Sequence, residues 1–260
     1  MPTALITGAS GGIGRELSLI LASNGYDIIA VARNADALEA LTEEIGSKYR
    51  RDVRAVPSDL SIPGAAREMC SDVGEIDILV NNAGFGDYGP FVECDPDKQM
   101  RMIDLHVRAL TDITRAILPG MVERKKGRIM NIASVAAFEP GPLMSVYYAT
   151  KVYVLSFSEA IQEELRGTGV TVTALCPGPT NTGFASAAGA TGANLFKEAA
   201  GADVKKVAAY GYRCMMRGKP VAICGLSFKF LTFWIRLMPR AATRRIVHYI
   251  QSRTKNRRKR

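Results

Sequence analysis

Short runs of aliphatic residues alternate along the chain with longer segments in which apolar residues recur every three or four positions. The short runs predict buried strands, and the longer segments predict amphipathic helices. Strands are expected at residues 3–7, 27–32, 53–57, 76–81, 127–132, 171–176 and 220–224. Helices are expected at residues 12–24, 35–49, 63–73, 97–124 and 145–168. This alternation predicts an α/β fold with a Rossmann-type, doubly wound, mostly parallel sheet of seven strands flanked by helices.

Length and composition fit one domain. The chain has 260 residues, 47% of them hydrophobic, so a single core over residues 1–260 is predicted. Residues 179–203 are rich in Gly, Ala, Ser, Thr and Asn and follow a predicted strand end. Ligands of doubly wound sheets bind beyond the strand ends, so this segment is predicted to be a substrate loop. A solvent-exposed insertion would have the same composition.

Charge is divided unevenly along the chain. Residues 1–203 hold 18 Lys and Arg and all 25 Asp and Glu, whereas residues 204–260 hold 16 Lys and Arg and no acidic residue. The net charge of +9 therefore comes from the last fifth of the chain. Residues 253–260 hold six of these cations and are predicted to form a basic, disordered tail. Nucleic-acid binding is not favoured, because the cations occur without a recognised binding module.

One segment of the basic region is strongly apolar. Residues 219–238 read KPVAICGLSFKFLTFWIRLM and contain the only tryptophan, Trp234. Phe228, Leu231, Ile235 and Met238 fall on one face if the segment is helical. The segment could form the floor of a substrate pocket, lie on an anionic membrane surface, or pack against a partner subunit. We favour the first interpretation, because aromatic and Met residues at helical spacing usually pack in the protein core.

The cysteines and the N-terminus suggest a compartment. The five cysteines are scattered, without a C-x-x-C pair, which predicts a reducing environment and no metal site. The sequence shows no secretory signal pattern and no run of 18 uncharged apolar residues. We therefore expect a cytoplasmic protein, with peripheral membrane contact through the basic region as an open alternative.

The first predicted strand runs directly into the glycine-rich sequence TGASGGIG at residues 7–14, and a helix follows. Glycines in this position let the backbone turn tightly and approach a pyrophosphate. Amide hydrogens at the positive end of the following helix can bind that anion. The motif therefore predicts a dinucleotide site.

A second group of residues carries acid–base chemistry. Tyr147 and Lys151 are four positions apart, so they share one helical face, and the ammonium is expected to lower the pKa of the phenol. Ser134 follows a predicted strand at the edge where substrates bind, and its hydroxyl can hydrogen-bond a reacting oxygen. Tyr148 offers a competing phenol, but its spacing to Lys151 is three.

With these motifs in this order, the sequence resembles the short-chain dehydrogenase/reductase family over residues 3–184. The resemblance also rests on Asp59-Leu60, on NNAG at residues 81–84, and on Pro177-Gly178 followed by Thr180 and Thr182. It implies that Tyr147 is the catalytic acid/base and that Ser134 orients the substrate. It implies that Lys151 lowers the pKa of Tyr147 and holds the nicotinamide ribose.

The resemblance also implies a set of cofactor-binding residues. They are Gly8, Ser10, Gly12, Ile13, Gly14, Arg33, Asp59, Leu60, Asn82, Ala83, Gly84, Tyr147, Lys151, Pro177, Gly178, Thr180 and Thr182. Asp59 and Leu60 would border the adenine, and Asn82 to Gly84 would line the adenosine side. The nicotinamide end would be surrounded by Pro177, Gly178, Thr180 and Thr182.

His106 departs from the family pattern. The family usually has an asparagine at this position of the long helix, where it helps to anchor a water beside the active-site lysine. His106 is therefore a candidate member of a proton relay, which would add pH dependence. The alternative, which we favour, is that His106 is a packing substitution with its hydrogen bonds satisfied locally.

The cofactor preference is predicted from the end of the second strand. NAD-binding sites of this kind place a carboxylate there for the ribose 2′-hydroxyl. This chain has Ala32 and Arg33 instead, and a guanidinium suits the 2′-phosphate of NADP. Ser10 is a possible further donor and Arg15 a weaker candidate. The alternative is that Arg33 follows the strand, lies in solvent and binds no ligand.

Together these features predict an NADP(H)-dependent oxidoreductase acting on a carbonyl or alcohol substrate with an apolar portion, such as a 3-oxoacyl derivative, an aldehyde or a ketone. The family resemblance implies a homo-oligomer, a dimer or tetramer, that pairs through the helices at residues 97–124 and 145–168. The alternative function is a catalytically silent cofactor-binding module that docks on a membrane or a partner through its basic C-terminal region.

Overall fold

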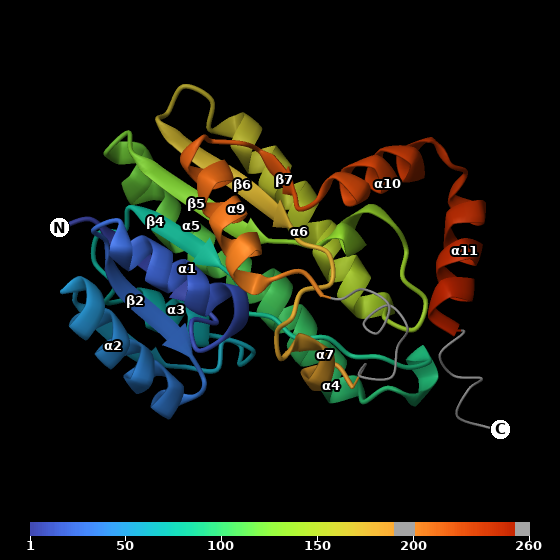
Figure 1. Ribbon diagram of the computed structural model, residues 1–260, viewed down its shortest axis with the longest axis horizontal. Helices are drawn as coiled ribbons and strands as arrows, with labels where there is room; N and C mark the ends of the chain where they lie inside the picture. Colours follow the sequence, from blue (N-terminus) through green and yellow to red (C-terminus); the bar gives the residue numbers. More distant parts are fainter. Residues whose placement is uncertain (190–200, 253–260) are drawn as a thin grey trace.

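The computed structural model describes residues 1–189 and 201–252 (Figure 1). The predicted basic tail, residues 253–260, lies outside the described residues, as do residues 190–200 of the predicted substrate loop.

A parallel sheet of seven strands forms the centre of the fold (Figure 1). The strands are β1 (Thr3–Thr7), β2 (Asp27–Ala32), β3 (Val53–Pro57), β4 (Ile78–Asn81), β5 (Gly127–Ile132), β6 (Val170–Cys176) and β7 (Val221–Ile223). Their order across the sheet is β3-β2-β1-β4-β5-β6-β7, and every neighbouring pair is parallel. This confirms the predicted doubly wound fold, with its reversal of strand order between β1 and β4.

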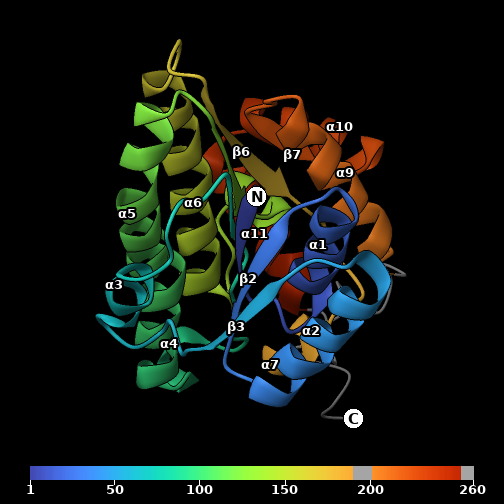
Figure 2. The same ribbon diagram turned by 90° about the vertical axis from the view of Figure 1, so that its left-hand side faces the viewer.

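Helices cover both faces of the sheet (Figure 2). On one side lie α3 (Ala65–Cys70), α4 (Pro96–Ile103), α5 (Leu110–Glu123) and α6 (Ser145–Glu164), and on the other lie α1 (Gly12–Ser23), α2 (Ala35–Tyr49) and α9 (Val204–Met216). Successive residues of β1 show why both faces are apolar. Ala4 and Ile6 pack in the core beneath α1, whereas Leu5 packs in the core beneath α5. Side chains alternate across a strand, so a strand buried on both faces is a continuous apolar run.

Two predicted helices differ from the structure. The helix expected at 97–124 is interrupted by a π-helical segment, Asp104–Ala109, between α4 and α5. The helix expected at 63–73 begins only at Ala65, because Gly64 has a positive φ of 94° that a right-handed helix does not allow. The π segment carries His106, and π-helical turns are common at functional sites.

The sequence suggested a helix within residues 219–238 but did not predict the helices before and after it. α9 was not predicted, although Val207, Ala208, Gly211, Cys214 and Met215 form its buried stripe. α10 (Leu226–Leu237) and α11 (Arg240–Ser252) follow β7 and lie at one end of the molecule (Figure 1). Pro239 separates these two helices because it cannot continue α10.

The last turn of α11 is tied to the body of the protein. The side-chain amide nitrogen of Gln251 donates to the phenol oxygen of Tyr148 (2.9 Å), and the phenol of Tyr88 donates to the main-chain carbonyl oxygen of Gln251 (3.0 Å). Thr243, Val247 and Gln251 form the buried side of this helix. Across residues 1–189 and 201–252, no helix is long and apolar enough to cross a membrane.

Candidate active site

A pocket of about 460 Å³ opens at the carboxyl ends of the strands. Its wall contains nearly all of the predicted site residues: Gly8, Ser10, Gly12, Ile13, Arg33, Asp59, Leu60, Asn82, Ala83, Gly84, Ser134, Tyr147, Lys151, Pro177, Gly178, Thr180 and Thr182. Two predicted residues, Gly14 and His106, lie behind this wall rather than in it. The described part of the predicted substrate loop also contributes, through Gly183, Phe184 and Ala187.

The glycine-rich turn after β1 is shaped by close backbone approach. Gly8 has a φ of 68°, and a side chain there would lie 2.7 Å from the amide nitrogen of Asn82. A side chain on Gly14 would collide with the carbonyl oxygen of Gly8. Gly14 therefore acts by letting α1 pack against the turn, which explains its place behind the pocket wall.

Thr7 and Asn82 hold this turn against the end of β4. The Thr7 hydroxyl accepts hydrogen bonds from the backbone N–H groups of Asn82 (2.9 Å) and Ala83 (3.0 Å). The Asn82 amide donates to the carbonyl oxygens of Thr7 (2.9 Å) and Gly8 (3.2 Å). This part of the NNAG motif therefore fixes the turn as well as lining the pocket.

The start of α1 is suited to an anion. Gly11 caps the helix, and within the described residues no side chain accepts a hydrogen bond from its first turn. The first N–H groups of a helix have no partner in the helix itself, and they favour a bound phosphate. The turn and the open helix end together fit the pyrophosphate of a dinucleotide.

Arg33 and Asp59 lie close to each other in the pocket wall. Arg33 Nη1 is 4.0 Å from Asp59 Oδ2, and the Arg33 side chain is 70% exposed. Burial alone would raise the pKa of Asp59, but hydrogen bonds from Ser61 and the Arg33 charge lower it overall. Asp59 therefore stays ionised, and the exposed guanidinium is available to an anionic ligand.

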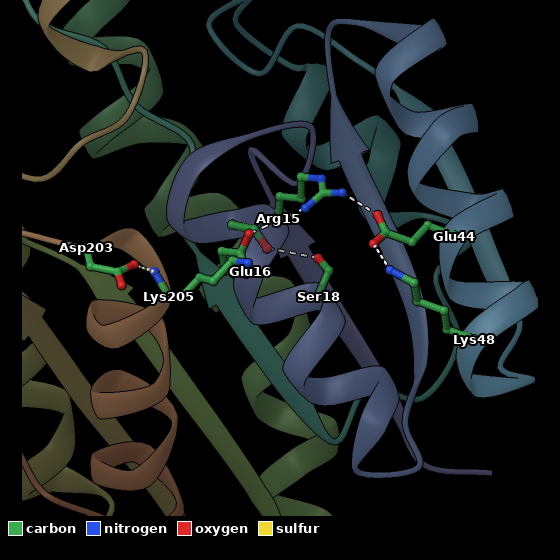
Figure 3. A network of polar contacts seen from close by, with 8 residues as sticks. Arg15, Glu16, Ser18, Glu44, Lys48, Asp203 and Lys205 are labelled. Atoms are coloured by element: carbon green, nitrogen blue, oxygen red, sulfur yellow. Dashed lines mark hydrogen bonds and ion pairs between the residues drawn. The ribbon is translucent and has the colours of Figure 1, made fainter.

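Arg15, the weaker candidate for the same role, has other partners. Its guanidinium pairs with Glu44 and lies 3.4 Å from Glu16 (Figure 3). Glu44 also accepts a hydrogen bond from Lys48 at 2.6 Å. The contacts therefore favour Arg33 over Arg15 as the residue that reaches a ligand.

The structure brings Ser134, Tyr147 and Lys151 together, although they come from different elements. Ser134 follows β5 and caps the short helix Val135–Phe138 by accepting from the Ala136 N–H (3.1 Å). Tyr147 and Lys151 lie one turn apart on α6, with Lys151 Nζ 5.7 Å from the centre of the Tyr147 ring. The Lys151 ammonium donates to the carbonyl oxygen of Ile132 (2.8 Å), which fixes it beside the end of β5.

Burial controls the protonation of this group. It raises the pKa of Tyr147 to about 12, an effect that a hydrogen bond with Ser134 partly offsets. Burial also lowers the pKa of Lys151 to about 8. Burial therefore sets the direction of the Tyr147 shift in the chain by itself, and a lowering of this pKa by Lys151 stays a prediction. A phenol that stays protonated at neutral pH is suited to donate a proton.

His106 is buried and has partners on both ring nitrogens. The Phe85 N–H donates to Nε2 (3.2 Å), so Nδ1 carries the proton and donates to the Thr150 hydroxyl (2.9 Å). Thr150 in turn donates to the Tyr147 carbonyl (2.8 Å). Burial and then the Lys151 charge lower the pKa of His106 well below its ordinary value. These contacts favour the packing interpretation, in which a neutral His106 ties the loop after β4 to α6.

A His106→Ala variant tests that interpretation. We expect a loss of about 1–3 kcal/mol in the free energy of unfolding, because the half-buried Phe85 N–H would lose its acceptor. The pH profile of turnover between pH 6 and 9 should keep its shape, since the imidazole is already neutral there. Denaturant unfolding and a kcat profile measure the two effects. A profile that loses one ionisation would instead assign His106 to a proton relay.

The pocket also contains residues that the sequence analysis did not single out. Glu139, in the segment between β5 and α6, lines the pocket, and burial raises its pKa to about 7. Met144 and Phe184 add apolar surface, with the Phe184 ring 5.2 Å from that of Tyr147. Glu139 had no local signal, since its segment has neither helical nor strand periodicity.

One face of α10 closes the same pocket. Phe228, Leu231, Thr232 and Ile235 line it, and a side chain on Gly178 would collide with the Phe228 ring. The prediction that residues 219–238 contribute to the pocket is confirmed for Phe228, Leu231 and Ile235, whereas Met238 is not among the lining residues.

Comparisons with known proteins agree with this geometry. A family model described as short chain dehydrogenase matches residues 2–193. A short chain dehydrogenase from Pseudocercospora fijiensis is 38% identical over 182 residues, covering 68% of this chain and 59% of that protein. A very-long-chain 3-oxoacyl-CoA reductase from Laccaria bicolor is 37% identical over 175 residues, covering 65% of this chain and 52% of that protein.

A solved structure extends the likeness beyond the matched sequence region. The short-chain dehydrogenase from Sphingobium yanoikuyae in complex with NADPH superposes with a TM-score of 0.83 at 32% identity, covering 91% of this chain and 92% of the other. The matches to the two curated relatives span only 59% and 52% of those proteins' lengths.

Proposed function

The chain belongs to the short-chain dehydrogenase family, and on that premise we propose that it is an NADP(H)-dependent oxidoreductase acting on a carbonyl or alcohol group. The observation that carries this proposal is the gathering of Ser134, Tyr147 and Lys151 in one pocket with the glycine-rich turn. The pocket thus joins a dinucleotide cradle to an acid–base group.

The residues of this chain divide the work between binding and proton transfer. In the direction of reduction, the Tyr147 phenol donates its proton to the carbonyl oxygen, and the Ser134 hydroxyl holds that oxygen in place. The Lys151 ammonium stabilises the phenolate that results and holds the ribose. When bound, the cofactor supplies the hydride that the substrate carbon receives.

The substrate is proposed to have an apolar portion. Met144, Phe184, Phe228, Leu231 and Ile235 line the pocket beyond the acid–base group. The names of two similar proteins, a very-long-chain 3-oxoacyl-CoA reductase and a ketone-specific alcohol dehydrogenase, support 3-oxoacyl derivatives and ketones as the first substrates to test, and we add aldehydes as a further class of carbonyl.

The experiment that tests the proposal is NADPH consumption with a panel of such ketones, aldehydes and 3-oxoacyl thioesters. We expect turnover with at least one class of apolar substrate. Binding of NADPH without consumption across the panel would instead favour a cofactor-binding module without catalysis.

The preference for NADP over NAD is proposed from Arg33. β2 ends at Ala32, and Arg33 directly follows it in the pocket wall. The nearby carboxylate, Asp59, accepts hydrogen bonds from Ser61 and lies 4.0 Å from Arg33. The guanidinium can thus bind a 2′-phosphate, and no carboxylate at the end of β2 repels that group.

An Arg33→Ala variant should weaken NADPH binding by about 1–3 kcal/mol, on the scale of a lost charge-assisted hydrogen bond. The affinity for NADH should change little, because NADH lacks the 2′-phosphate. Titration of each cofactor by fluorescence or calorimetry measures the difference. Arg15→Ala is the matched control and should leave both affinities near those of the wild type, whereas equal losses in Arg33→Ala would indicate a structural role.

A homo-oligomer is proposed through α5 and α6. The family resemblance places these helices at a two-fold axis, and α6 exposes Val152 on its outer side. Light scattering at micromolar concentration should therefore give at least twice the chain mass of 28.1 kDa. A monomeric mass at that concentration would contradict the proposal.

A further inference from the structure

α10 is apolar on two opposite sides. The pocket side carries Phe228, Leu231, Thr232 and Ile235, at spacings of three and four residues. The outer side carries Leu226, Phe230, Phe233, Trp234 and Leu237, also at three- and four-residue spacings. The outer side chains are exposed, by 81% for Leu226, 67% for Phe230 and 63% for Leu237. A surface helix ordinarily has one apolar face, so the outer side of α10 needs a separate explanation.

The exposed apolar side chains of the two helices form what we call the α10–α11 face, which comprises Leu226, Phe230, Phe233, Trp234 and Leu237 of α10 and Ile246 and Ile250 of α11. The Trp234 ring lies 5.7 Å from that of Phe230 and 6.0 Å from that of Phe233. On α11, Ile246 and Ile250 are exposed one turn apart. Both helices lie at one end of the molecule, past the β7 edge of the sheet (Figure 1). Large exposed apolar patches of this kind mark interaction sites.

The charge of the same two helices is entirely positive. Residues 226–252 contain five Lys and Arg and no Asp or Glu. Arg240, Arg244 and Arg245 are exposed, and no ion pair within residues 1–189 and 201–252 involves them. The α10–α11 face therefore combines aromatic side chains with unpaired cations.

We propose that the α10–α11 face docks on the surface of an anionic lipid bilayer. Aromatic and aliphatic side chains would enter the boundary between headgroups and acyl chains, while the arginines approach the anionic headgroups. Each cation near such a surface adds electrostatic attraction to the anionic lipids. Burial of the aromatic and aliphatic side chains adds a hydrophobic contribution that acts only on contact. A second copy of this chain fits less well, because two faces with the same positive charge repel each other.

This docking does not depend on the proposed reaction, but α10 would link the two. The helix has the pocket on one side and the lipid surface on the other. A substrate dissolved in the bilayer would then lie one helix away from the pocket.

Trp234 allows a direct test, because it is the only tryptophan of the chain and belongs to the α10–α11 face. The full chain is mixed with vesicles of phosphatidylglycerol and phosphatidylcholine, or of phosphatidylcholine alone. We expect the Trp234 emission to shift to shorter wavelength with the anionic vesicles, since the indole leaves water. The shift should weaken as salt rises, because a Debye length of about 10 Å at 0.1 M salt screens surface charge.

Two matched pairs of variants separate the apolar and the charged contributions. Phe230→Asp should lower vesicle affinity at least tenfold, whereas Ile62→Asp should not, because Ile62 is exposed at the opposite, β3 edge of the sheet. The double variant Arg244→Glu with Arg245→Glu should lower affinity about tenfold or more and remove most of the salt dependence. Lys205→Glu with Lys206→Glu changes the net charge equally, and we expect a smaller effect.

Thermal unfolding and NADPH binding establish that each variant is folded. Equal emission shifts with neutral and anionic vesicles, no shift at low salt, or unchanged binding by folded Phe230→Asp would each overturn the proposal. A Trp234 emission that depends on protein concentration without vesicles, together with a mass that falls in Phe230→Asp, would assign the face to a second copy and also overturn it. None of these measurements relies on turnover, so failure of the proposed reaction would be seen separately.

Discussion

Tyr147→Phe is expected to lower turnover by about 10²–10⁴-fold, the range for loss of a positioned general acid. The substitution removes the one proton that this side chain can transfer and keeps the ring that contacts Phe184 and His106. NADPH affinity should stay close to that of the wild type, because the rest of the pocket wall is unchanged.

The neighbouring tyrosine supplies the control. Tyr148 lies on the same helix and lines the same pocket, but its phenol oxygen is held by Gln251 of α11. Burial and then the Glu139 charge raise the pKa of Tyr148, as burial raises that of Tyr147, so the two phenols differ in their hydrogen-bond partners and not in the direction of this shift. Tyr148→Phe should therefore keep most of the turnover and lose about 1 kcal/mol of stability with the Gln251 hydrogen bond. Steady-state kinetics and unfolding of both variants give the comparison.

The reverse result would change the assignment. If Tyr148→Phe abolishes turnover while Tyr147→Phe retains it, the acid is Tyr148, and Tyr147 only packs against the substrate. Retained turnover in both variants would remove the phenol from the mechanism.

Lys151→Ala should impair two properties at once. We expect turnover to fall by about 10–100-fold and NADPH affinity by about tenfold, because one ammonium stabilises the phenolate and holds the ribose. Steady-state kinetics and cofactor titration separate these effects. Lys126→Ala removes an exposed lysine that pairs with Asp77 and should leave both properties unchanged. A loss confined to cofactor affinity would mean that Lys151 does not act on the phenol.

The same lysine predicts a pH dependence. Burial lowers the pKa of Lys151 to about 8, so the ammonium is present below that pH and is lost above it. Reduction by the wild type should therefore slow as pH rises through about 8, whereas Lys151→Ala should lack this decline. A wild-type rate that is flat up to pH 10 would contradict the assigned role of the charge.

The sequence by itself determined the strands, their order along the chain and the glycine-rich and acid–base motifs of the site. The central strands β1, β2, β4, β5 and β6 could be predicted because a strand buried on both faces is a short, largely apolar run. The glycine-rich turn and the spacing of Tyr147 and Lys151 are local features, so their geometry follows from the helix and the turn that contain them. The uneven distribution of charge along the chain could also be predicted, because it depends only on the order of residues.

Only the tertiary structure decided how these residues behave. The pKa values of Tyr147 and Lys151 depend on burial, which the four-residue spacing of the two side chains does not reveal. The role of His106 depends on Phe85, 21 residues away, and on Thr150, 44 residues away. The position of α11 also depends on a distant residue, because the Gln251 side chain bonds to a tyrosine 103 residues earlier.

α10 shows the difference most clearly. Its sequence indicates an apolar helix but not which side is covered, because the pocket that covers one side is built from α6 and from the segments that follow β4, β5 and β6. Folding places Phe228 against Gly178 and leaves Phe230 and Trp234 in contact with solvent. The periodicity of a sequence identifies which residues share a face of a helix, whereas the surface that meets that face is assembled from distant segments and exists only after folding.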